Sequence, residues 1–262
     1  MYSLYENSKY NFTAYKTIVI KEVLRFSRIW LQTIVPPAIT MGLYFVIFGQ
    51  LIGSQLNDIN GYSYIDYIVP GLIIMSIISN SYSNVVSSFY STKFHHHIEE
   101  LLVSPISNFT IIAGYVSGGV ARGLIVGVIV TIVSLFFTEL HIHNYFISIL
   151  IAILTACLFS LAGLINAIFA KSFDDISIVP TFVLTPLTYL GGVFYSIEML
   201  PDFWQKVSLF NPVLYMVNGF RMGMLGVSDA SLAAAIIIIL GFIILLGSIC
   251  LWLLHKGIGV KK

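Results

Sequence analysis

The stretch KFHHHIEELLVSPIS, at residues 93–107, is a short polar segment between two long apolar runs. It contains one lysine, three consecutive histidines and two adjacent glutamates. The apolar runs on either side, at about residues 67–89 and 111–137, are each long enough to cross the ~30 Å hydrocarbon layer of a membrane as a helix. The polar segment therefore marks a place where the chain leaves the bilayer and turns back into it.

The composition of the whole chain agrees with a membrane location. Its 262 residues are 58% hydrophobic and only 10% charged, with a mean hydropathy of +0.93, whereas a soluble domain carries about 25% charged residues. The apolar runs are continuous and do not alternate, which argues against a transmembrane β-barrel. The net charge of +1 gives no indication of nucleic-acid binding. We expect an all-α integral membrane protein.

The sequence predicts six transmembrane helices, because six apolar runs approach or exceed the ~20 residues that a membrane crossing needs. They lie at about residues 31–52, 67–89, 111–137, 145–169, 176–194 and 232–254.

Lysine and arginine are unevenly distributed among the segments that join these runs. Ten of them fall on one side, which includes the N-terminal segment, Lys93, Lys171 and the C-terminal tail, whereas Lys206 and Arg221 fall on the other. Basic residues concentrate on the cytoplasmic side of membrane proteins. Both termini and the 93–107 segment are therefore predicted to be cytoplasmic.

Residues 15–30 form an amphipathic pattern before the first span. Apolar residues such as Ile18 and Phe26 alternate with charged residues such as Lys21 and Glu22, and Trp30 closes the segment. The pattern is typical of a helix in the headgroup layer; a snorkelling extension of the first span is the alternative. We thus divide the chain into a cytoplasmic N-terminus with an amphipathic interfacial helix, residues 1–30, and a six-span domain, residues 31–262.

The 93–107 segment is itself predicted to be a short helix. On a helix, the apolar residues Phe94, Ile98, Leu101 and Leu102 share one face, and Glu99 and Glu100 point away from it. Pro105 ends the helix, and Ser107 can cap the next span. The helix is either a linker that rests on the protein's own membrane surface or a lever on which another protein acts.

A lever needs a source of energy, and the sequence holds no ATP-hydrolysing motif. The pattern G-x-x-x-x-G-K-[ST], whose backbone cradles phosphates, is absent, because neither Lys16-Thr17 nor Lys171-Ser172 follows the required glycines. Any ATPase that drives this chain must be a separate polypeptide.

Four stretches resemble the permease subunit of bacterial ABC exporters of the type-2 family. They are PGLIIMSIISNSYSNVVSSFY (70–90), IEELLVSPIS (98–107), FDDISIVPTFVLTPLTYLGGVFYSIEMLP (173–201) and FNPVLYMVNGFR (210–221). The resemblance runs from about Lys21 to the C-terminus, and residues 173–221 are its most specific part. The first twenty residues carry no recognisable signature.

The resemblance implies a multi-pass permease of the bacterial inner membrane that is not itself an enzyme. Two permease copies pair, most simply as a homodimer, and two copies of a separate ABC ATPase, which carry ATP and magnesium, dock beneath them. It also implies that residues 15–30 are an amphipathic helix, that the 94–107 segment is the coupling helix, and that residues 200–224 form an external pair of short re-entrant helices. Relatives move glycans, lipid-linked substrates or drugs, so we expect an amphipathic, lipid-linked or glycan-type substrate or a drug.

Two sets of residues are candidates for energy coupling and for the translocation path. Asp174 and Asp175 lie at the start of the fifth run and add to the candidates from the 93–107 segment. Ser172 and Asp175 fit a capping box, which is a structural role. The alternative is that the two aspartates make a second contact with the ATPase. Prolines in that run predict a kink. The coupling candidates are Ile98, Glu99, Glu100, Leu101, Leu102, Pro105, Asp174 and Asp175; the path candidates are Arg122, Pro180, Pro186 and Tyr189.

The segment before the last span is apolar but interrupted. Asn211 and Pro212 predict an N-cap followed by proline at the first helical position. Two helices too short to cross indicate a re-entrant hairpin or external gate, with aromatic residues such as Trp204 at the interface. The candidates for this gate are Pro201, Trp204, Phe210, Asn211, Pro212 and Arg221.

Two arginines and three histidines remain to be placed. Arg122 lies inside the third run, so it is expected to face protein or water, with an ion pair, a lipid headgroup or the cytoplasmic surface as its contact. Arg221 is expected at headgroup level, where it binds a lipid phosphate or anchors the chain. His95, His96 and His97 cannot all face one ion from consecutive helical positions, so we expect no metal site.

Two other functions stay open on the sequence alone. An ion-coupled secondary transporter requires acidic residues or histidines inside its spans. The six runs hold essentially no ionisable residue besides Arg122, which argues against this function. A membrane scaffold without an ATPase is compatible with the scattered charges.

Overall fold

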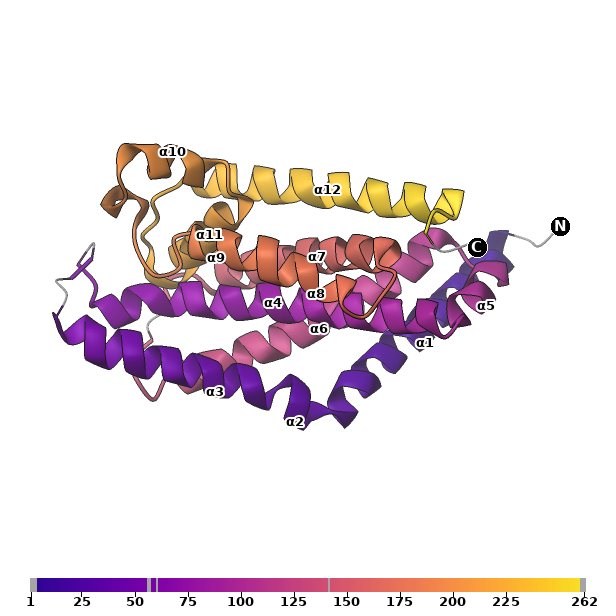
Figure 1. Cartoon of the computed structure of the whole chain (residues 1–262), viewed down its shortest axis with the longest axis horizontal. Coiled ribbons are helices and arrows are strands. Elements are labelled where there is room, and N and C mark those ends of the chain that lie inside the picture. Colours follow the sequence, from indigo (N-terminus) through magenta and orange to yellow (C-terminus); the bar gives the residue numbers. More distant parts are fainter. Residues whose placement is uncertain (1–3, 56–57, 60, 141, 260–262) are drawn as a thin grey trace.

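The computed structural model describes residues 4–55, 58–59, 61–140 and 142–259, so Lys261 and Lys262, which contributed to the predicted charge asymmetry, lie outside the described residues. Within these ranges all regular secondary structure is helical, and turns and loops join the helices. One isolated bridge pairs Ile59 with Tyr62. Figure 1 shows long helices lying side by side in an elongated bundle.

The elements follow one another with short connections. In chain order they are α1 (Leu4–Arg28), α2 (Trp30–Thr33), α3 (Val35–Tyr44), the π-helix η1 (Phe45–Ile52), the 3₁₀ turn η2 (Gly53–Gln55), α4 (Tyr64–Phe94), α5 (His97–Val103), α6 (Asn108–Ser134), α7 (Tyr145–Phe169), α8 (Asp175–Val179), the π-helix η3 (Pro180–Leu184), α9 (Thr185–Tyr189), the 3₁₀ turn η4 (Ile197–Met199), α10 (Asp202–Leu209), α11 (Pro212–Leu225) and α12 (Leu232–Lys256).

Five helices of the described residues are long and apolar enough to cross a bilayer. They are Trp30–Gly49, Tyr64–Phe94, Asn108–Ser134, Tyr145–Phe169 and Leu232–Lys256. They correspond to five of the six predicted runs, and α7 has the predicted bounds. The chain is therefore an all-helical, multi-span membrane protein, as the sequence predicts.

The predicted fifth span, residues 176–194, is not one regular helix. It consists of α8, η3 and α9, and the helical path ends at Tyr189. Pro186 has no backbone N–H to donate one turn back, and the amide of Thr185 instead reaches the carbonyl of Pro180, five residues earlier. This wider hydrogen bond defines the π turn, and it divides the predicted run into three elements.

Helix α4 is the centre of the bundle. Most of its residues are buried, and it packs against α6 and α7 along their length. Glycines allow this close approach: a Cβ at Gly163 of α7 would lie 2.6 Å from the carbonyl oxygen of Tyr82 on α4. Small residues serve the same purpose between membrane helices generally. By contrast, few residues of α12 are buried, and several of its large apolar side chains, such as Ile237 and Ile244, are exposed.

The two ends of the bundle differ in character. The start of α1, α5, the end of α7 and the end of α12 lie together at one end, and α10 lies at the other (Figure 1). Side-chain contacts agree, because Asn11 of α1 accepts a hydrogen bond from the amide of Ser107 and Lys93 donates to the last carbonyls of α7. The predicted topology places the same segments on one side of the membrane.

Gly163→Ala is expected to lower the free energy of unfolding by about 2 kcal/mol, because the new methyl group overlaps backbone rather than a movable side chain. Thermal unfolding of the purified chain in detergent measures the effect. Gly241→Ala on α12 is the matched control, since a Cβ there meets nothing within 4 Å. Equal melting temperatures for the two variants would contradict the close α4–α7 packing.

Candidate functional site

Helix α5 begins after a sharp break in the chain. α4 ends at Phe94, and His96 adopts a left-handed conformation with φ of 61°, unusual for a residue other than glycine. His96 also pairs with Glu99 at 3.1 Å. The predicted helix of residues 94–107 is therefore shorter than expected, and it spans His97–Val103, with Ser104 as its C-cap.

The predicted apolar face of this helix is confirmed except at its first residue. Ile98 is 1% exposed and belongs to the core, and Leu101 and Leu102 pack against that core from half-buried positions. Phe94 belongs to α4 and is 53% exposed, so its predicted place on the same face was wrong. The opposite face carries Glu99 and Glu100, both exposed as predicted, together with Val103 at 85% exposure and the exposed Pro105 beyond it.

The Asp174–Asp175 turn lies at the same end of the bundle as α5. The ring of Phe173 packs against Tyr90 and Phe94 at the end of α4, at centroid distances of 4.9 and 5.2 Å. Lys93 donates hydrogen bonds to the carbonyls of Ile168 and Ala170, and these bonds supply a partner to carbonyls that the end of α7 leaves without one. The structure thus brings both sets of coupling candidates together.

The predicted capping box at Ser172 and Asp175 is confirmed. The amide of Ser172 donates to Asp175 at 3.0 Å, and the amide of Asp175 donates to the Ser172 hydroxyl at 3.2 Å. Hydrogen bonds from the Lys171 amide, and then from Ser172, hold the pKa of Asp175 below its ordinary value. The stabilisation is present above the unfolded pKa and is lost as the pH falls through the folded one.

A pocket of about 520 Å³ opens beside α5. It lies between α5 and the ends of α4 and α7, with Lys93, Glu99 and Lys171 among the residues that line it. The pocket is lined mainly by apolar side chains, and Lys93, Glu99 and Lys171 place charges at it.

The buried carboxylate of Glu22 joins α1 to α4. Its side chain is fully buried, accepts a hydrogen bond from Ser88 at 2.5 Å and pairs with Arg25 at 3.2 Å. Arg25 also donates to the side-chain oxygen of Asn84 at 2.8 Å. The amphipathic pattern predicts Glu22 on the polar face of an interfacial helix, whereas the structure buries it. The missed signal was the spacing of Asn80, Asn84 and Ser88, which puts polar side chains on one face of a predicted span.

The four path candidates lie in different surroundings, and only Pro180 is next to the serines of α4. Pro180 lines a narrow pocket of about 80 Å³ with Thr185, Ser79 and Ser83. Pro186 and Tyr189 follow on α9, and both are exposed. Arg122 lies on α6, where it donates to the side-chain oxygen of Asn80 at 3.2 Å and forms no ion pair within the described ranges. Its predicted contact with protein is confirmed.

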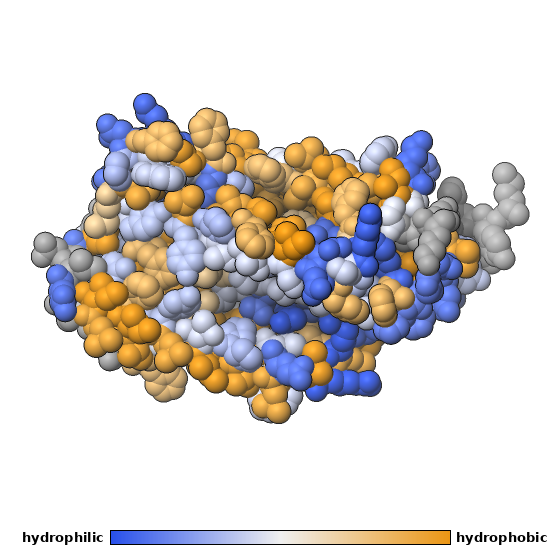
Figure 2. Space-filling view, viewed as in Figure 1, coloured by the Kyte–Doolittle hydropathy of each residue, from blue (hydrophilic) through white to orange (hydrophobic). Residues whose placement is uncertain are grey.

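Serines form a polar stripe on the same face of α4. Ser79, Ser83 and Ser87 recur every four residues and are exposed or half-buried. Figure 2 shows a pale band of weakly hydrophilic side chains across this view, between two orange apolar regions. We call Ser79, Ser83, Ser87 and Thr185 the polar seam. Within the seam, the hydroxyl of Ser87 donates to the carbonyl of Ser83 at 2.7 Å and that of Thr185 to the carbonyl of Pro180 at 3.0 Å.

The predicted pair of short helices exists at the other end. Asn211 caps α11 by accepting from the amide of Val213 at 3.0 Å, and Pro212 occupies the first position, as predicted. Asn211 also donates to the carbonyl of Leu187 at 2.6 Å, which ties α11 to α9. Pro201 precedes α10, and Trp204 and Phe210 are exposed, the latter at 90%.

Arg221 faces protein and has no exposure to lipid or solvent. It is fully buried, donates to the carbonyl of Gly192 at 2.6 Å, and lies 4.0 Å from the centroid of the Tyr67 ring. Asp229 accepts from Ser196 and from the amide of Ile197, each at 3.0 Å. The predicted contact with a lipid phosphate is therefore wrong. Arg221 instead fastens the 192–197 loop to α4 and α11.

Within the described ranges, no three histidine, cysteine, aspartate or glutamate side chains are placed to share a metal ion. His95 and His97 stack at 6.0 Å between ring centroids on the exposed surface.

Comparisons with known proteins agree on one family. The sequence profile described as ABC-2 type transporter matches residues 13–225. The inner membrane transport permease YadH of Escherichia coli K12 is 57% identical over 249 residues, which is 95% of this chain and 97% of the relative. Nodulation protein J of Rhizobium leguminosarum biovar viciae is 20% identical over 185 residues, or 70% of this chain and 71% of the relative.

Glu22→Ala is expected to destabilise the chain by roughly 2 kcal/mol, because it leaves the buried groups of Ser88 and Asn84 without their acceptor. Thermal unfolding in detergent measures the loss. Glu22→Gln keeps an acceptor and is expected to lose less, and Glu198→Ala, at an exposed position, is expected to change little. A Glu22→Ala variant as stable as wild type would show that the α1–α4 contact does not depend on this carboxylate.

Proposed function

The chain belongs to the ABC-2 type transporter family, and from this premise we propose that it is the membrane subunit of an ATP-driven exporter. Its relatives are named as transport permeases, and the chain itself is a multi-span helical membrane protein. In the proposed complex, the permease provides the path across the membrane, and a separate ABC ATPase, with its ATP and magnesium, provides the energy.

The observation that carries this proposal is the exposed face of α5. A short helix outside the predicted spans presents Glu99, Glu100 and Val103 to solvent while Ile98 is anchored in the core. An exposed valine beside two carboxylates is a surface that another protein can cover. The chain lacks a phosphate-cradling motif, so the partner that fits is the ATPase.

Two rigid connections can transmit a push on α5 into the membrane. The first is Ile98, which packs in the same core as α4 and α7. The second is the Glu22–Arg25–Asn84 network, which joins α1 to the middle of α4. Because α4 is central and close-packed, a displacement at its end is carried to its neighbours rather than absorbed.

The polar seam is the proposed wall of the path, and a second permease copy is its proposed neighbour. Hydroxyls that face lipid are unfavourable, whereas a partner copy that brings its own seam would enclose them. Pro180 borders the seam, and the π turn η3, which begins at Pro180, lies beside it. We therefore propose a homodimer of permeases with two ATPase subunits.

In this arrangement the chain crosses the membrane six times. Residues 176–194 form the fifth crossing in broken form, and α10 with α11 forms the external re-entrant hairpin, held by Asn211 and Arg221. Residues 31–262 constitute the permease domain, and residues 1–30 the cytoplasmic N-terminus. Both termini are cytoplasmic, and the location is the bacterial inner membrane, as in the name of the YadH relative.

The substrate proposed is amphipathic, lipid-linked or glycan-type, or a drug. The seam offers small hydroxyls and no exposed charge, which suits a cargo with both polar and apolar parts and does not suit free ions. The interiors of the described spans hold few ionisable groups. Transport coupled to an ion gradient needs such groups to bind the ion or proton, so ion coupling is disfavoured.

Val103→Asp and Glu100→Lys are expected to lower ATPase binding by about tenfold or more, because they change the exposed face of α5 without disturbing the core. Co-purification of the ATPase with the permease, and stimulation of ATP hydrolysis by the permease in liposomes, measure the effect. Leu101→Asp and Leu102→Asp are expected to uncouple hydrolysis from transport, with some loss of stability because both residues touch the core.

Glu198→Lys is the matched control, since it places the same change at the opposite end of the bundle. Transport by the permease alone in liposomes, with no ATPase present, would overturn the proposed function. If Val103→Asp and Glu100→Lys both bind the ATPase as well as wild type does, α5 is not part of the contact between permease and ATPase.

Cysteines introduced at Glu198 and Asp202 are expected to react with membrane-impermeant maleimide in intact cells, because the topology places both outside. Cysteines at Glu99 and Glu100 are expected to react only after the membrane is opened. Both pairs are exposed in the structure, so burial does not explain a difference. The reverse pattern would invert the proposed orientation.

A further inference from the structure

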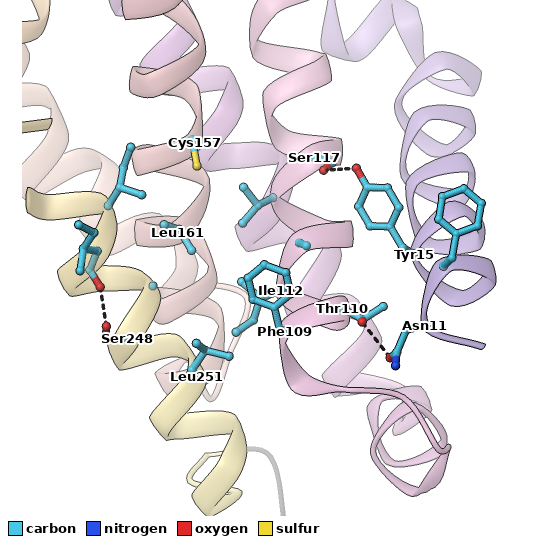
Figure 3. A pocket seen from close by; sticks show the side chains of 16 residues that line it. Asn11, Tyr15, Phe109, Thr110, Ile112, Ser117, Cys157, Leu161, Ser248 and Leu251 are labelled. Atoms are coloured by element: carbon cyan, nitrogen blue, oxygen red, sulfur yellow. Dashed lines mark hydrogen bonds between the residues drawn. The ribbon is translucent and has the colours of Figure 1, made fainter. Parts of the chain in front are cut away.

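A large apolar groove lies on the lipid-facing side of the bundle, away from the polar seam. It has a volume of about 800 Å³ and is formed by α1, α6, α7 and α12. Figure 3 shows Tyr15 of α1, Phe109 and Ile112 of α6, and Leu251 of α12 around it. No residue of the groove belongs to α5, α9 or the polar seam, so the groove is separate from the proposed coupling and transport surfaces.

The lining and the location decide what can fill the groove. The lining contains no charged residue, and its few polar groups are largely occupied: Tyr15 pairs with Ser117 at 2.9 Å, and Ser248 donates to the carbonyl of Ile244. Three of the four walls are helices that can cross a bilayer. At that depth there is no water to fill a cavity, so hydrocarbon is the expected content.

Basic residues lie on two of the helices that form the groove, near its α5 end. Lys9 and Lys16 lie three residues before and four after Phe12, which lines the groove, so all three share one stripe of α1. His255 follows Leu251 by one turn on α12, and Lys256 is next to it. All four basic side chains are exposed. The mouth is therefore complementary to an anionic headgroup.

We propose that this groove binds one anionic phospholipid from the leaflet at the α5 end. One acyl chain occupies the groove between α6 and α12, and the phosphate lies near Lys9 and Lys16. Each basic side chain near a membrane surface contributes about a fivefold preference for anionic lipid. The lipid joins α1 to α12, two helices that have little contact with each other otherwise.

Native mass spectrometry of the full chain in detergent tests the site, with phosphatidylglycerol and phosphatidylcholine as the two probes. Wild type is expected to retain one phosphatidylglycerol, roughly tenfold more than phosphatidylcholine. Gly247→Leu fills the groove, where a Cβ meets nothing closer than 3.9 Å, and is expected to retain neither. Gly241→Leu, on the same helix but outside the groove, is the matched control and is expected to behave as wild type.

Lys9→Gln/Lys16→Gln is expected to lower the preference for phosphatidylglycerol at least fivefold, whereas Lys206→Gln, at the other end of the bundle, keeps the preference. These surface changes do not threaten folding, so they test the proposal even where Gly247→Leu is unstable. Equal retention of both lipids by wild type, or unchanged retention by Gly247→Leu, overturns it. A second copy of the chain held in place of lipid, and lost in Gly247→Leu, also overturns it. No ATPase is present, so the result is independent of the proposed export function.

Discussion

The structure depends on one constraint: a charged side chain inside the bundle must have a polar or aromatic partner inside the bundle, because the surrounding hydrocarbon offers none. The carboxylate of Glu22 meets this constraint through Ser88 and Arg25. Arg122 meets it through Asn80, and Arg221 through Gly192 and the ring of Tyr67. In each case the side chain connects α4, or the loop packed on it, to another element. The polar groups of this membrane protein therefore fix which helices lie next to α4.

Close packing supplies the rest of the arrangement. Glycines on α6 and α7 bring these helices against α4, so α4 is surrounded by protein, whereas α3 and α12 present their large side chains outward. The two ends then take different roles. One end holds α5, the Asp174–Asp175 turn and the Lys93 contacts with α7. The other end holds α10 and α11, whose position depends on Asn211 and Arg221.

Local sequence rules predicted the elements better than their partners. The long apolar runs located five spans, and caps such as Ser107 and Asn211 were found because they act on the backbone within three residues. The start of α5 was not predicted because the left-handed position before it is occupied by His96, whereas glycine is the residue that usually signals this conformation. Glu22 and Arg221 were misplaced for a related reason: a charged residue near the end of an apolar run is compatible with solvent, and only partners more than 25 residues away decide that it is buried.

The π turn at Pro180–Leu184 has a geometric consequence for Tyr189. A π turn holds one more residue than an α turn, so a helix that loses it turns everything beyond by about 100°. Thr185 marks the present register, because its amide and hydroxyl both reach the carbonyl of Pro180. If that hydrogen bond slipped by one residue, Pro186 and Tyr189 would rotate about the helix axis without any change in the tilt of the helix. The direction in which these two exposed side chains point is thus set by which amide bonds to the carbonyl of Pro180.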